Sequence, residues 1–159
     1  MTKLVTSERI ANKAVRNAHV DANAITSDKL ASDAVGARVY FLGVYEQKGL
    51  AADSTGVKYE GPRIKVKKKH LKAATLRATW TASNTDSETA IEVYNVTKGQ
   101  VVGSVSGNTG DDQEVSLDLT KIDDGDLVEV RVNVTTASAT SGATTDVKYA
   151  VVEFDYYES

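Results

Sequence analysis

The chain has 159 residues, a formal net charge of −3 and no cysteine. This length suits one ordinary domain, or a small domain with an appendage. The absence of cysteine excludes a disulfide framework and thiol chemistry, and no apolar run approaches the roughly 18 residues that a membrane-spanning helix needs. Residues 1–20 lack the apolar core of a signal peptide, so Sec export is not expected.

Charge is distributed unevenly along the chain. Residues 41–80 carry nine Lys/Arg and three Asp/Glu, whereas residues 81–159 carry four Lys/Arg and fifteen Asp/Glu. A general nucleic-acid binder is usually basic over its whole domain. The uneven charge predicts a surface with separate basic and acidic regions. We expect neither nucleic acid nor a membrane as a partner.

The chain opens with a ten-residue repeat, VTSERIANKA VRNAHVDANA ITSDKLASDA V, within residues 4–35. A period of ten does not suit one continuous helix, because supercoiled helices need apolar periods of seven or eleven. One short helix per block fits better: Thr6 or Ser7 can cap a helix whose apolar face is Ile10, Ala11 and Ala14. The aligned slots are β-branched (Val5, Val15, Ile25, Val35), basic (Arg9, His19, Lys29), large and apolar (Ile10, Val20, Leu30) and alanine (Ala14, Ala24, Ala34).

Such helices have about two turns and are not stable alone in water. We therefore expect parallel chains to associate through the repeat. Three chains are favoured, because each block offers two large apolar residues to a common axis. The residues expected to hold the chains together are Val5, Ile10, Val15, Val20, Ile25, Leu30 and Val35. A parallel β-solenoid or β-prism, which would use the same slots differently, is the alternative.

Runs such as AITSDKLASDAV resemble the short repeats in fibre proteins of tailed bacteriophages. They are most similar to head fibres, in which three chains wind into a supercoil of helix-turn-helix units, and related repeats occur in tail fibres. The resemblance covers residues 4–35 only. It implies a homotrimeric fibre on the virion surface, with a shaft made of repeats.

The remaining chain alternates between strand and turn patterns, and Gly36 marks the expected boundary between a repeat segment, residues 1–36, and a β domain, residues 37–159. The motif TKG indicates a hairpin between the fourth and fifth strands, and Trp80 is expected in the core. Eight strands predict a mainly β fold, an antiparallel β-sandwich of the jelly-roll type. The expected strands cover residues 38–45, 63–69, 74–83, 88–96, 100–107, 113–120, 124–136 and 146–157.

No residue pattern indicates a catalytic centre, a metal site or a cofactor. His19 shares its slot with Arg9 and Lys29, and His70 has no cysteine or second histidine near it. The motifs G-x-S-x-G and H-E-x-x-H and the P-loop are missing. We therefore expect no enzyme activity, no metal ion and no cofactor, although a Ser-His-Asp triad assembled by the fold would leave no such signal.

Two acidic stretches, GDDQE (110–114) and DDGD (123–126), allow three interpretations. Paired carboxylates serve glycoside hydrolysis, oxygen-rich loops bind Ca²⁺, and Asp with Gly forms turns. We favour turns. The calcium alternative keeps some weight, because clustered Asp without basic partners is electrostatically unfavourable. A polysaccharide depolymerase would depend on Asp111, Asp112, Asp123 or Asp124.

A basic run, RIKVKKKHLK, covers residues 63–72. Nucleic-acid binding is not favoured, because no aromatic side chains are interleaved to stack on bases. The run could dock on an acidic capsid surface or an anionic glycan, or it could be a solvated strand whose lysines prevent edge-to-edge pairing. Tyr156 and Tyr157 could line a subunit interface or a sugar platform. The candidate polyanion or capsid contacts are Arg63, Lys65, Lys67, Lys68, Lys69 and Lys72.

Together these patterns predict a non-enzymatic virion structural protein, a trimeric head fibre or capsid decoration protein. Its N-terminal repeats would contact the major capsid protein or another virion protein, and its sandwich would face outward and touch host-surface glycans weakly. The alternatives are a glycan-binding tail-fibre tip, which predicts a groove near aromatic residues or acidic loops, and a subunit of an extracellular filament, which predicts open-ended polymers.

Overall fold

The structure is a computed structural model that describes residues 36–157, and within this range it is mainly β. The expected short helices of residues 4–35 lie outside the described residues. No helix in this range is long and apolar enough to cross a membrane. The elements are β1 (Gly36–Ala51), β2 (Gly56–Glu60), β3 (Ile64–Lys65), β4 (Leu71–Ala82), β5 (Glu88–Asn95), β6 (Gln100–Gly107), β7 (Thr109–Ser116), the 3₁₀ helix η4 (Leu119–Lys121), β8 (Leu127–Thr136) and β9 (Thr144–Tyr157).

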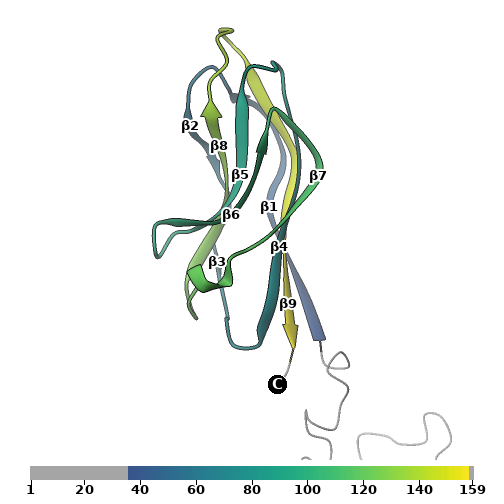
Figure 1. The fold of residues 1–159 in the computed structure, drawn as a ribbon, viewed down its shortest axis with the longest axis vertical. Coiled ribbons are helices and arrows are strands. Elements are labelled where there is room, and N and C mark those ends of the chain that lie inside the picture. Colours follow the sequence, from purple (N-terminus) through teal and green to yellow (C-terminus); the bar gives the residue numbers. More distant parts are fainter. Residues whose placement is uncertain (1–35, 158–159) are drawn as a thin grey trace, which may run out of the picture. The chain divides into compact units, whose positions relative to one another are not determined.

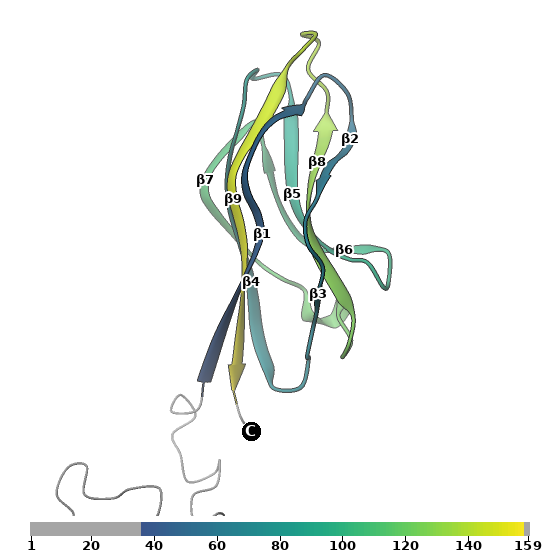
Figure 2. The ribbon, with the colours of Figure 1, turned by 180° about the vertical axis from the view of Figure 1, so that it is seen from behind.

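Two sheets face each other across the core (Figures 1 and 2). One has the strand order β1-β9-β4-β7, and the other has the order β2-β8-β5-β6, with β3 also paired to β8. The pairing is nested: β5 pairs with β6, β4 with β7, β2 with β8 and β1 with β9. The chain is thus one long two-stranded ribbon folded over into two layers, which confirms a sandwich of two antiparallel sheets.

The alternation of side chains along each strand decides which residues enter the core. On β8, Val128, Val130, Val132 and Val134 are all at most 1% exposed, because every second side chain of a strand points to the same face. Trp80 on β4 is 1% exposed, and its indole N–H donates to the carbonyl of Gly107 at 3.1 Å. The expected core position of Trp80 is therefore confirmed.

The hairpin predicted at TKG is confirmed as well. β5 and β6 pair in antiparallel register from Thr89 opposite Gly107 to Asn95 opposite Gln100. The backbone N–H of Gly99 donates to the carbonyl of Asn95 at 2.8 Å, and Gly99 has a φ of 68°, a value that favours glycine.

Three strand predictions need correction. Of the expected strand 63–69, only Ile64–Lys65 is a strand, because the chain then turns and buries Val66, which is 2% exposed. The strand expected over 113–120 is instead β7, Thr109–Ser116, so the acidic stretch 110–114 lies inside a strand and not in a turn. β2 was not expected, since its alternation is only five residues long.

Candidate interaction surface

The basic run 63–72 is mostly a loop that joins β3 to β4 and is anchored on the acidic turn before β8. Val66 is the anchor: its backbone N–H donates to the carbonyl of Asp126 at 2.8 Å, and its carbonyl accepts from the N–H of Gly125 at 2.8 Å. The N–H of Lys68 donates to a carboxylate oxygen of Asp124 at 2.8 Å. The structure thus brings together a basic and an acidic segment that the sequence presents as separate candidates.

The carboxylates of the turn 123–126 hold this end of the sandwich together. One carboxylate oxygen of Asp126 accepts from the N–H of Asp123 at 2.8 Å and from the side-chain amide of Asn95 at 2.7 Å. These two hydrogen bonds, and then the charges of Lys98 and Lys68, keep the pKa of Asp126 below its ordinary value despite some desolvation. The amine of Lys98 lies 2.7 Å from a carboxylate oxygen of Asp123.

These contacts favour the turn interpretation of DDGD over the calcium interpretation. The calcium alternative assumed Asp residues without basic partners, and that assumption is wrong here because Lys98 pairs with Asp123 and lies 3.8 Å from Asp126. Across residues 36–157, no group of three or more His, Asp or Glu side chains is placed so that it could hold a metal ion.

The other acidic stretch is engaged with its own sheet. The hydroxyl of Tyr149 donates to a carboxylate oxygen of Asp112 at 2.7 Å, and the N–H of Asp112 donates to the hydroxyl of Thr79 at 2.9 Å. Asp112 has a φ of 45° and lies at an irregularity in the β4–β7 register. The carboxylate thus helps to position a bulge.

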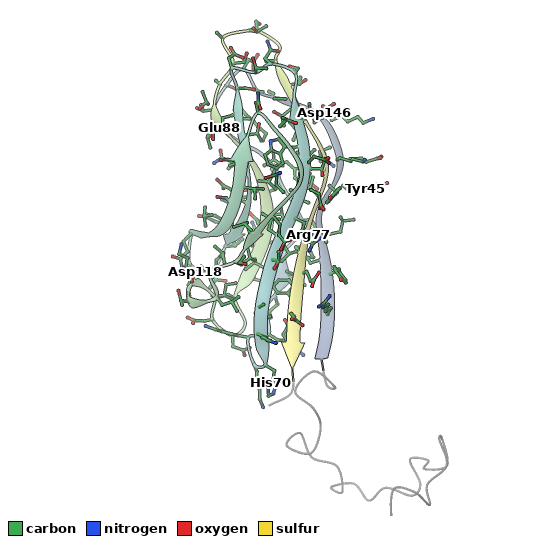
Figure 3. All side chains as sticks on the ribbon, turned by 45° about the vertical axis from the view of Figure 1, so that its right-hand side comes forward. Tyr45, His70, Arg77, Glu88, Asp118 and Asp146 are labelled. Carbon is green, nitrogen blue, oxygen red and sulfur yellow. The ribbon has the colours of Figure 1, made fainter. Side chains whose placement is uncertain are left out.

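The six candidate basic residues separate into two groups. Arg63 binds a buried carboxylate: its Nε lies 2.8 Å from Glu129, whose side chain is 1% exposed. The others form the lysine loop (Lys65, Lys67, Lys68, Lys69 and Lys72), in which all but the half-buried Lys68 are exposed. The loop lies at the end of the sandwich where β1 begins and β9 ends, next to the labelled His70 in Figure 3. Binding of a polyanion or a capsid by the lysine loop stays a prediction.

Glu129 is the centre of a charged cluster on the outer face of the β8 sheet. Its second carboxylate oxygen accepts from Nε of Arg131 at 2.6 Å, and Arg131 also pairs with Glu60 at 3.1 Å. The Arg131 guanidinium lies over the ring of Tyr94, 3.5 Å from the ring centroid. Burial raises the pKa of Glu129, but hydrogen bonds from Arg63 and then Arg131 outweigh it, so the pKa lies below its ordinary value.

Sequence reasoning missed the exposed apolar side of β1. Tyr40, Leu42 and Tyr45 are 61%, 50% and 61% exposed; we call these three residues the β1 patch. Phe41 packs against the core and Val44 is 1% exposed, so β1 is apolar on both faces. The run VYFLGVY, with almost no polar residue, carries the signal that could have revealed a strand with two apolar faces.

An open hollow of roughly 370 Å³ lies on the other half of this sheet, lined by Glu46, Lys48, Thr79, Trp80, Thr81, Asp146, Val147 and Lys148. Asp146 already accepts a hydrogen bond from the N–H of Gly49 at 2.7 Å. The hollow includes neither the acidic stretches nor the lysine loop.

The expected oligomerisation residues, from Val5 to Val35, lie outside the described residues. Tyr156 is half-buried against the core.

No protein-family model matches the chain, and no curated protein matches it. A structure of infectious bursal disease virus, Gx strain, is similar with 11% identity and a TM-score of 0.43, over 80% of this chain and 33% of that chain. A structure of Bacillus endospore appendages, described as disulfide-linked pili, is similar with 15% identity and a TM-score of 0.36, over 79% of this chain and 88% of that chain. This chain spans only about a third of the viral chain, and at these TM-scores neither similarity bears on function.

Proposed function

We propose that this protein is a non-enzymatic structural protein of a virus particle, displayed on the particle surface as a homotrimeric head fibre or capsid decoration. The observation that carries the proposal is a ten-residue repeat that continues without a linker into a β-sandwich. Val35 occupies the last apolar slot, and β1 begins at Gly36. The resemblance of residues 4–35 to bacteriophage fibre repeats supports it.

The nested strand pairing supports the finer proposal that the sandwich is a jelly roll. Eight strands arranged as two Greek keys define that fold, and the two four-strand orders β1-β9-β4-β7 and β2-β8-β5-β6 support it. In this proposal the short β3 is an addition beside β8. The sandwich presents the loops at its far end to the outside of the particle.

In the proposed assembly, residues 4–35 of three chains associate through their apolar slots and contact the major capsid protein or another virion protein. The lysine loop supports such an attachment, because it lies at the end of the sandwich where β1 begins (Figure 1) and carries several exposed amines that an acidic surface would attract. Three sandwiches per fibre would make weak contacts with host-surface glycans effective through avidity.

The test is light scattering after size exclusion, on the full chain and on a chain that starts at residue 37. The truncated chain keeps every core residue, since the core cluster extends from Val44 to Phe154. We expect a trimer of the 17.0 kDa chain at full length and a monomer after truncation. A full-length monomer would contradict the trimer, and a mass that grows without limit with concentration would favour the filament alternative.

The glycan-binding tail-fibre tip is a second candidate because of the hollow beside β1. Its carboxylates (Glu46, Asp146) and amines (Lys48, Lys148) could bond sugar hydroxyls. Binding of the full chain to a glycan array, lost in Asp146→Asn and kept in Asp118→Asn, would favour this candidate. Asp118 is a suitable control because it caps the short helix η4 outside the hollow.

A further inference from the structure

β1 is an edge strand with an apolar outer face. It has one neighbour in its sheet, β9, and is sixteen residues long. Such strands invite pairing or packing with another chain unless charges or coverings protect them. The opposite edge strand, β7, carries Asp111, Asp112 and Glu114 along its length. By contrast, residues 39–45 of β1 carry no charge and expose two tyrosines and a leucine, whereas the charged Arg38, Glu46 and Lys48 lie to either side.

The direction of the β1 patch follows from its neighbours along the strand. Phe41 contacts the core, and a Cβ on Gly43 would lie 2.1 Å from a methyl carbon of the buried Val130, so both positions face inward. Tyr40 and Leu42 therefore point outward, since successive side chains of a strand alternate. The alternation breaks after Gly43, because Gly43 and Val44 are both buried, so Tyr45, which follows Val44 and is 61% exposed, is also directed outward (Figure 3).

The neighbouring strand extends this apolar surface. Val151 on β9 lies between the buried Ala150 and Val152, so it points outward and is half-buried. A salt bridge closes one end of the surface, with Nε of Arg38 placed 3.5 Å from a carboxylate oxygen of Glu153. An apolar centre with a polar margin is typical of a protein–protein contact surface.

We propose that the β1 patch is a contact surface between copies of this chain, and that it packs against the same patch of neighbouring copies around the fibre axis. This inference rests on the proposed function, because the trimeric repeat supplies the axis. The repeat ends at Val35, one residue before β1 begins, and Tyr40 follows four residues after Gly36. Four residues of strand span about 13 Å, so each patch begins within that length of chain from the end of its repeat.

The lack of cysteine makes the contact directly testable. Leu42→Cys places one thiol in the patch. Leu127→Cys is a matched control, because Leu127 is also an exposed leucine, 38% against 50%, but lies on β8 in the other sheet. Both variants are made in the full chain, and disulfide-linked dimers are followed on non-reducing gels during mild oxidation, with light scattering on the same samples.

We expect Leu42→Cys to form linked dimers at least ten times faster than Leu127→Cys. In a closed trimer the linked fraction should level off near two thirds of the chains, because three thiols around one axis form a single disulfide. Equal rates in the two variants, with the full chain still a trimer, would overturn the patch and leave the proposed fibre intact. A monomeric full chain would overturn both.

The remaining alternative is that the chain's own residues 1–35 cover the β1 patch. If these covered the patch, the Leu42→Cys thiol would be slow to alkylate in a monomeric chain without forming dimers, and that result would overturn the contact between copies. Tyr45→Ser should raise the concentration for half-dissociation at least tenfold, while Val57→Ser, at a 44% exposed position on β2, should leave it unchanged. Equal effects of the two serine variants would also contradict the proposal.

Discussion

Glu129→Gln tests whether the buried carboxylate on β8 stabilises the sandwich. Glutamine keeps the shape of the side chain, but it has one acceptor oxygen, so an arginine donor would face its amide N–H. Of the two hydrogen bonds that Glu129 accepts, 2.8 Å from Arg63 and 2.6 Å from Arg131, one would therefore be lost, and the other would lose its negatively charged acceptor. Leaving a buried donor or acceptor without its partner destabilises by about 1–3 kcal/mol, and by more where the group is charged. Because Arg63 is 51% exposed and partly solvated, we expect about 2 kcal/mol at pH 7.

The chain offers a matched control in Glu114→Gln. Glu114 also pairs with an arginine at 2.8 Å, Nη2 of Arg77, but the two side chains are 50% and 44% exposed. Solvent screens such a pair, so its loss should change the free energy of unfolding by no more than about 0.5 kcal/mol. Urea unfolding measures both variants, with the fluorescence of the single tryptophan, the buried Trp80, as the probe.

The pH dependence gives an independent check. The pKa of Glu129 in the folded protein lies below 4.5, the ordinary value for glutamate, because of its arginine partners. A depressed pKa contributes stability that is present above pH 4.5 and is lost as the pH falls through the folded value. The wild type and Glu129→Gln should therefore converge at low pH. A loss at pH 7 no larger than that of Glu114→Gln, or a difference independent of pH, would refute the reasoning.

Two further predictions concern the core and the lysine-loop end. Gly110 lies opposite Trp80 in the β4–β7 register, and an added Cβ would come within 2.3 Å of the indole ring. Gly110→Ala should therefore destabilise the fold by about 1–3 kcal/mol and shift the tryptophan emission. Unchanged emission and stability would contradict this packing. Asp126→Asn should lower the melting temperature at pH 7. The melting temperature of the variant should also fall less steeply than that of the wild type below pH 3.8, the ordinary pKa of aspartate, since the pKa of Asp126 in the folded protein is depressed. An unchanged dependence of the melting temperature on pH from 3 to 7 would show that the carboxylate does not support the turn.

Strands whose burial alternates with period two could be predicted from local pattern. β4, β5, β6, β8 and β9 lie within a few residues of the expected strands, because a half-buried strand encodes its inward face in every second residue. Alternation gave a wrong prediction for the basic run. Its Arg63, Lys65 and Lys67 alternate with apolar residues, but only two residues of the run form a strand and pair with β8.

The candidate surface was predicted less well than the fold. The lysines were named from their density in the sequence, but their anchor, the turn 123–126, lies far along the chain: Lys68 and Asp124 are 56 positions apart. The partner of Arg63 is 66 positions away on β8. No local pattern reveals which carboxylates a cation will meet. The separation of the basic run into an arginine paired with a buried carboxylate and a lysine loop with mostly exposed side chains therefore required the folded chain.

Local chemistry along the chain is enough to predict a repeat of apolar slots, a mainly β domain and the inward faces of its longer strands, since each depends on the spacing of side chains along one segment. The nested order of the strands, the pairing of Glu129 with two arginines and the exposure of Tyr40, Leu42 and Tyr45 at a sheet edge depend on contacts between segments far apart in the chain. Those contacts are selected by the packing of the whole sandwich, because a side chain is buried or exposed only by what the rest of the chain places against it.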